Sequence, residues 1–170
     1  KKDVNAEKQA SQFELLMELT DAAGYEHYEI SNFSKPGFRS KHNSSYWQCK
    51  PYLGLGPSAH SYNGGSRQWN VSSNALYIES ISKKILPQQQ EMLSQTQKLN
   101  EYIMTGLRTS EGISLKAVEQ LSDEPTALQI LKEAQKFIYE KLMGVSDGTL
   151  FLTRKGKLFA DGIASDLFRM

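Results

Sequence analysis

The hydrophobic pattern of this chain changes near residues 86–91, and that change limits what the chain can fold into. After residue 91, apolar side chains recur at three- and four-residue steps, the spacing of amphipathic helices. Before it, residues 32–74 are rich in Gly, Ser, Asn and aromatic residues and have no helical period. The Gln-rich run at 86–91 is therefore interpreted as a linker between two structural parts of different type.

The second part is predicted to be helical, with one β-hairpin. Ser94 and Gln97 have the spacing of a capping box, in which two residues satisfy each other's backbone groups at the start of a helix. The elements predicted after this cap are a helix to 107, helices at 114–121 and after 123, a hairpin at 143–152, and a last helix with Phe159, Ile163 and Leu167 facing inward. Three helices, a hairpin and a closing helix resemble a winged-helix-like module.

Winged-helix modules often bind DNA, so the charge of the longest predicted helix bears on function. Lys132, Lys136 and Lys141 share that helix and its end with Glu133 and Glu140, which gives a balanced solvated face instead of a basic stripe. We therefore expect no nucleic-acid partner and a packing role for this module.

The first part is predicted to mix one helix at each end with short strands between them. Asn5 can cap the first helix and Gly24 suits its end. The predicted elements are a helix over 6–23, strands at 28–31, 52–55, 60–62 and 68–71, and a helix over 74–84. Together with the second part, this predicts an α+β fold.

Composition excludes several classes of protein. The chain has 170 residues, 39% of them apolar and 23% charged, with 20 Lys and Arg against 19 Asp and Glu. It can build a core, and its near-neutral charge is typical of neither a polycation nor an acidic tail. Its single cysteine, Cys49, excludes an internal disulfide framework. With no apolar run near the roughly 20 residues of a membrane helix, we expect a soluble, cytoplasmic protein without stable membrane insertion.

The sequence begins at Lys1 and is helical in pattern within a few residues. We therefore expect the chain to be part of a longer protein.

Chemically distinctive residues concentrate in the middle of the chain. All three histidines lie between 27 and 60, and nine of the 17 aromatic residues lie between 25 and 69. Residues 30–78 contain no Asp or Glu but five Lys or Arg, so this stretch carries +5 and the rest of the chain −4. Such a stretch suits a flat, anionic, π-rich ligand. The alternative is a turn-rich β segment whose aromatic residues form ordinary core.

Other motifs in this stretch are weaker. His42, Cys49 and His60 lack the spacing of a zinc site, and no fourth ligand is evident. The glycines at 54 and 56 lack the third glycine and the following helix of a dinucleotide-binding turn.

Several runs of this sequence resemble the oxygen-independent coproporphyrinogen III oxidase-like proteins of the radical S-adenosylmethionine superfamily, and their heme-chaperone branch in particular. The His-Asn-x-x-Tyr-Trp core is specific when it is embedded in the flanking matches, and Ser58 departs from the family, which more often has Gly there. The matching runs are YEHYEISNF at 25–33, KPG at 35–37, HNSSYW at 42–47, YLGLGPSAHS at 52–61, EYIMTGLR at 101–108 and LTRKG at 152–156.

The resemblance implies a fold and cofactors for the longer protein. The fold is a partial (β/α) barrel with a [4Fe–4S] cluster and S-adenosylmethionine, followed by a C-terminal helical domain. In this chain it implies that residues 1–88 are the end of the barrel with a His-containing loop region, and that 89–170 are the winged-helix-like domain. The cluster needs a C-x-x-x-C-x-x-C triplet that this sequence lacks, so the chain alone is expected to be inactive as an enzyme.

The resemblance also implies site residues. In the chaperone branch the His-Asn-x-x-Tyr-Trp motif is associated with heme binding. This makes His42 the candidate axial ligand of heme iron, with Asn43 orienting it and Tyr46 and Trp47 forming a stacking wall. Candidate propionate contacts are Arg39 and Lys41, and the residues expected at the barrel mouth are Ile30, Ser31 and Asn32.

Three functions remain open from the sequence. The first is heme delivery or porphyrin biosynthesis, with heme or a porphyrinogen as ligand and a heme-acceptor protein or an electron donor as partner. The second is a non-catalytic protein-interaction module. The third is true oxygen-independent coproporphyrinogen III oxidation, which decarboxylates propionates.

Overall fold

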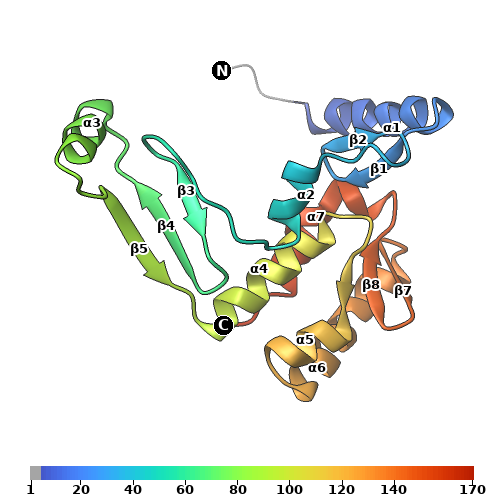
Figure 1. Cartoon of the computed structure of the whole chain (residues 1–170). Helices are drawn as coiled ribbons and strands as arrows, with labels where there is room; N and C mark the ends of the chain where they lie inside the picture. The colour runs from blue at the N-terminus through green and yellow to red at the C-terminus, as the bar shows by residue number, and fades with distance from the viewer. Residues whose placement is uncertain (1–4) are drawn as a thin grey trace.

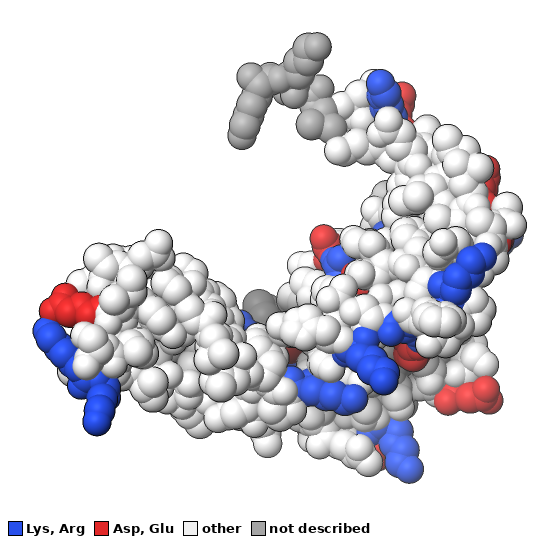
Figure 2. Space-filling view, turned by 45° about the horizontal axis from the view of Figure 1, so that its top comes forward, with Lys and Arg blue, Asp and Glu red and all other residues white. Residues whose placement is uncertain are grey.

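The computed structural model describes residues 5–170 and has an α+β fold with short antiparallel sheets. Figure 1 shows two parts. We call residues 60–92 the arm and the rest of the described chain the body. The two parts enclose a hollow, and Figure 2 shows few charged side chains lining it on the face in view.

The N-terminal end of the body is a helix followed by a β-hairpin. Helix α1 (Ala6–Ala22) begins where the Asn5 side chain accepts a hydrogen bond from the Lys8 amide, at 3.0 Å. It ends before Gly24, whose φ of +72° is the left-handed conformation that glycine adopts easily. The strand expected at 28–31 is confirmed only over 28–29. The strand β1 (Glu26–Glu29) ends there, and the chain turns at residues 30–31 to pair β1 with β2 (Asn32–Ser34).

A short helix, α2 (Lys41–Trp47), follows the hairpin. This corrects the expectation that residues 32–74 contain no helix. The Ser40 side chain caps it by accepting a hydrogen bond from the Asn43 amide, at 3.2 Å. Seven residues make about two turns, which is too short for a periodic apolar pattern to show in the sequence.

The arm is a three-stranded antiparallel sheet with one helix. Its elements are β3 (His60–Tyr62), β4 (Ser66–Asn70), α3 (Asn74–Ser82) and β5 (Gln88–Met92), in sheet order β3-β4-β5. The linker expected at 86–91 is therefore wrong, because β5 pairs with the whole of β4. The strand expected at 52–55 reduces to one bridge between Tyr52 and Tyr62.

The C-terminal part of the body alternates helices with a second three-stranded sheet. Its elements are α4 (Gln95–Leu107), β6 (Ile113–Ser114), α5 (Leu115–Leu121), α6 (Glu124–Tyr139), β7 (Met143–Ser146), β8 (Thr149–Leu152), the 3-10 helix η1 (Gly156–Phe159) and α7 (Ala160–Asp166). The sheet order is β6-β8-β7. The capping box of Ser94 and Gln97 is confirmed, since both of its hydrogen bonds form.

The hydrophobic core lies within this C-terminal part. Leu99 and Ile103 of α4, Ile130 of α6 and Leu150 of β8 are almost fully buried and belong to one cluster. Ile163 and Leu167 face this core as predicted, but Phe159 does not: it is 52% exposed at the end of η1. The 3-10 turn before α7 takes Phe159 out of the α-helical phase that the prediction assumed.

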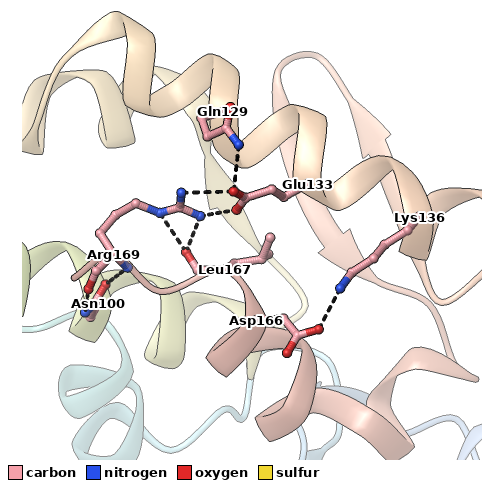
Figure 3. A network of polar contacts seen from close by, with 7 residues as sticks. All are labelled: Asn100, Gln129, Glu133, Lys136, Asp166, Leu167 and Arg169. Atoms are coloured by element: carbon pink, nitrogen blue, oxygen red, sulfur yellow. Dashed lines mark hydrogen bonds and ion pairs between the residues drawn. The ribbon is translucent and has the colours of Figure 1, made fainter.

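A polar network closes the C-terminus onto the body (Figure 3). The Asn100 side chain donates to the carbonyl oxygen of Arg169 and accepts from its amide, both at 2.8 Å. The Arg169 guanidinium pairs with both carboxylate oxygens of Glu133. These bonds tie the chain end to α4 and α6.

Among residues 5–170, no helix combines the length and the apolar character that a membrane crossing requires.

Candidate functional site

The candidate ligand-binding residues cluster on α2 and the two residues before it. Residues 42 and 46 are one helical turn apart, as are 43 and 47. The His-Asn-x-x-Tyr-Trp motif is therefore two side-by-side pairs, and the structure gives these pairs different surroundings.

The first pair, His42 and Tyr46, is exposed. The His42 Nε2 atom lies 3.3 Å from the Tyr46 hydroxyl, and the rings meet edge to face with centroids 5.0 Å apart. Tyr46 in turn contacts Tyr52 at 4.7 Å between centroids, and Tyr52 lies 6.2 Å from Tyr62 of the arm. An imidazole thus stands at one end of a row of tyrosines that runs from the body to the arm.

The second pair, Asn43 and Trp47, contacts the rest of the body. The Asn43 side chain donates to the side-chain oxygen of Asn32 at 3.0 Å. The guanidinium of Arg108 lies over the Trp47 indole, 5.2 Å from the ring centroid. The Trp47 Nε1 atom is buried and has no hydrogen-bond partner among residues 5–170.

Both contacts of this second pair lead to one buried carboxylate, Glu29. It has no exposed surface. It accepts hydrogen bonds from the Ser31 amide at 2.9 Å, from the Asn32 side chain, and from Arg108 Nε at 3.0 Å. Sequence analysis missed Glu29 and Arg108. A signal was available for Glu29, because it immediately precedes the acid-free stretch and lies in one of the runs that carry the family resemblance.

The cations of the acid-free stretch are partly neutralised by acids from outside it. Arg39 pairs with Glu26 at 3.0 Å and with Glu111, and the hydrogen bond to Glu111 raises the pKa of Arg39. Burial favours a higher pKa for Glu111, but the hydrogen bond and charge of Arg39, together with hydrogen bonds from the Glu111 backbone and Ser110, give a net lowering of the pKa. Lys41 is exposed and makes no ion pair within the described chain.

The expected barrel-mouth residues, Ile30, Ser31 and Asn32, lie at the turn of the β1–β2 hairpin. Ile30 and Ser31 line a cleft of about 1060 Å³ between α1 and the η1–α7 segment, and Arg108 and Lys157 line it as well. Burial lowers the pKa of Lys157 to about 8, although Glu29 opposes the shift. The Lys157 ammonium donates to the His27 carbonyl at 3.1 Å. Asn32 does not line this cleft and turns toward α2.

The side chains present suit some cofactors better than others. An exposed imidazole with a neighbouring aromatic ring fits heme, whose iron takes histidine as an axial ligand. A [4Fe–4S] cluster does not fit, because the sequence has one cysteine. Within residues 5–170, no three His, Cys, Asp or Glu side chains gather as a metal-binding group.

Comparison with known proteins shows what this chain is related to. Residues 93–159 match the HemN C-terminal domain. The heme chaperone HemW of Bacillus subtilis (strain 168) is 33% identical over 92% of this chain, and that of Lactococcus lactis subsp. lactis (strain IL1403) is 31% identical over 88%. The chain is related to the HemW and HemN proteins. It spans about two fifths of the length of the HemW relatives it matches, 42% and 39% for these two.

The fold agrees with this relationship. The structure of coproporphyrinogen III oxidase (HemN) from Escherichia coli, a radical SAM enzyme, superimposes on 90% of this chain with a TM-score of 0.68. This chain covers 39% of that structure, and the two are 17% identical in sequence. The HemN likeness therefore concerns the fold, whereas the closer sequence similarity is to HemW.

Proposed function

We propose that this chain is the heme-binding portion of a HemW-like heme-delivery protein. One observation carries the proposal: an exposed imidazole, His42, is held against Tyr46 at the head of a row of tyrosines. The relatives that share about a third of its residues are named heme chaperones, which supports delivery over propionate decarboxylation. We place this activity in the cytoplasm.

Each candidate residue has a proposed role in holding heme. His42 would hold the heme iron through an imidazole nitrogen, and bound heme would supply the coordination site and the two propionates. Tyr46 contacts the macrocycle, and Lys41 is the cation available for a propionate. Arg39 can contact a propionate only by giving up part of its pairing with Glu26 and Glu111. Asn43 and Trp47 support α2 from its other side.

The longer protein and the fold within it complete the proposal. We assign the [4Fe–4S] cluster and S-adenosylmethionine to parts of the protein outside these 170 residues. The part of the chain before α4 would be the end of a partial (β/α) barrel, and the part from α4 onward a winged-helix-like domain. The boundary expected at 88/89 would then move to the end of β5, because β5 pairs with β4. The order helix, strand, two helices and hairpin from α4 to β8 supports the second assignment.

Titration with hemin tests the function. We expect a Soret shift with the 170-residue chain and a loss of affinity of at least tenfold in His42→Ala. His60→Ala is the matched control, because His60 is also exposed, lies next to Trp69 at 6.4 Å between centroids, and is not on α2. Equal hemin binding by wild type and His42→Ala would refute the role of His42. Failure of the wild type to bind would favour a protein-interaction module.

A further inference from the structure

The ligand His42 needs a fixed orientation, and α2 is too short to supply it alone. A seven-residue helix has marginal intrinsic stability in water, so its rotation about its own axis depends on tertiary contacts. No residue of α2 is fully buried, so apolar packing alone fixes that rotation only weakly. The side-chain contacts of Asn43 and Trp47 with the body add to it, and both lead to the same place.

That place is the buried ion pair between Glu29 and Arg108. One Glu29 oxygen accepts from Arg108 Nε at 3.0 Å. The other accepts from Asn32, whose side-chain oxygen in turn accepts from Asn43. A charged carboxylate with no exposure is strongly destabilised if it loses a partner, so this arrangement tolerates little rearrangement.

Arg108 fixes the other end of the helix. Its guanidinium lies over Trp47, donates to Glu29, and donates through Nη1 to Asp161 at 3.0 Å. Its backbone carbonyl accepts from the Ile30 amide at 3.0 Å, which ties it to the hairpin turn. Arg108 directly follows α4, the helix that carries much of the core. Residues 43 and 47 are thus both anchored to a rigid element.

We propose that Asn32, Glu29 and Arg108 are positioning residues for the His42 ligand. They hold the Asn43–Trp47 side of α2 against the body, which leaves the His42–Tyr46 side facing outward. This inference rests on the proposed function and deepens it. Partners that orient a metal-binding histidine typically contribute roughly 10–100-fold to affinity when they are removed.

Asn43→Ala is the main test, because it removes the link to α2 and leaves every hydrogen bond of Glu29 in place. Asn32→Ala removes the same link, but it also removes one donor from Glu29. Hemin affinity is measured by titration, and axial coordination by the Soret band and by electron paramagnetic resonance. We expect affinity to fall about tenfold in each variant. We also expect the histidine-ligated signature to give way to a mixture of coordination states, which a general loss of stability would not produce.

Asn100→Ala is the matched control. It removes an asparagine that makes two hydrogen bonds of similar length, but at the C-terminus and away from α2. We expect it to keep the wild-type affinity within twofold and the wild-type spectrum, even where it lowers the Tm. An equal effect of Asn100→Ala on hemin binding would overturn the positioning role.

Three outcomes separate this inference from the proposed function. If His42→Ala loses hemin and the two asparagine variants bind and coordinate it as the wild type does, His42 is the ligand and the positioning role is wrong. If His42→Ala binds hemin as the wild type does, His42 is not the ligand and the positioning role fails with it. If the wild type does not bind hemin, the proposed function fails. Circular dichroism at the titration temperature confirms that each variant compared is folded.

Discussion

Among single residues, Ser58 has a strained backbone conformation at the position where this sequence departs from the family pattern. Its φ is +59°, the left-handed region that an L-residue with a Cβ atom occupies at a cost of roughly 1–2 kcal/mol. Glycine, which the family resemblance leads us to expect at this position, adopts that φ without strain.

Ser58→Gly is therefore expected to stabilise the protein. Relief of the left-handed conformation is partly offset by the greater freedom of glycine in the unfolded chain, which leaves a gain of about 0.5–1 kcal/mol. The Ser58 amide keeps its hydrogen bond to the Val71 carbonyl in both proteins. Urea unfolding measures the gain, and a loss of stability would show that the serine hydroxyl has a role that its contacts do not reveal.

The lowered pKa of Lys157 predicts a pH dependence of the free energy of unfolding. Its folded-state pKa is lowered to about 8 by burial, from an ordinary value of 10.5. Between these two pH values the unfolded chain binds more protons at this residue than the folded chain, so the free energy of unfolding rises with pH. Relative to Lys157→Met, the wild type is expected to gain stability from about pH 8 to about pH 10.5. A pH-independent difference between the two would contradict the lowered pKa.

At the scale of secondary structure, the caps were predicted well and the weakly patterned elements were not. Asn5, Ser94 and Asp123 each accept the hydrogen bond expected of an N-cap, because capping depends on residues a few positions apart. The strand β5 was missed because its QQQEM sequence has neither apolar alternation nor β-branched residues. Its pairing with β4 depends on a tertiary contact that local sequence does not encode.

The contact between Glu133 of α6 and Arg169 near the C-terminus predicts a second pH dependence of stability, which the Glu133→Gln variant tests. The hydrogen bonds from Arg169, and then from Gln129, lower the pKa of Glu133 in the folded state. A lowered carboxylate pKa contributes stability that is present above the ordinary value of 4.5 and is lost as pH falls through the folded value. We expect Glu133→Gln to cost about 1 kcal/mol near neutral pH. The cost should disappear in acid.

Glu119→Gln is the control for this experiment. Glu119 is exposed on α5 and makes no ion pair within the described residues. We expect its unfolding free energy to match the wild type across the same pH range. If both variants lost the same stability near neutral pH and regained it in acid, the cause would be the change in net charge and not the contact with Arg169.

For the whole molecule, the arm and the body differ in how they are stabilised. Of residues 60–92, Ser66 alone is buried, whereas the body holds the core cluster. Large apolar side chains of the arm remain exposed, among them Ile78 at 67% and Met92 at 72%. An ion pair between Arg67 and Glu101 links the arm to α4.

Hydrogen exchange should therefore differ between the two parts. Backbone amides of β3, β4 and β5 are expected to exchange at least tenfold faster than those of α4 and α6, because local opening costs less where few apolar contacts are lost. Exchange measured by mass spectrometry on the 170-residue chain tests this. Equal protection in arm and body would mean that the arm is stabilised by contacts other than apolar burial, or is covered in solution by another molecule.

The sequence predicts which segment holds the candidate site, but not its internal arrangement. The cluster of histidine and aromatic residues indicates the middle of the chain, and the family resemblance indicates residues 42–47, which lie on α2. The charge of +5 counted for residues 30–78 overstates the local positive charge. Glu26 and Glu111 lie outside that stretch, but in the folded chain both pair with Arg39. The division of the motif into an outer and an inner pair required knowing that residues 41–47 are helical.

The helical form of α2 also decides where the chain can tolerate a change in length. Each residue advances a helix by about 100°, so one inserted residue between Asn43 and Tyr46 would swing the tyrosine away from the imidazole while the asparagine stayed in place. An insertion before Ser40 or after Trp47 would leave that angular relation intact. Related chains should therefore vary in the neighbouring loops while keeping the spacing inside the motif constant.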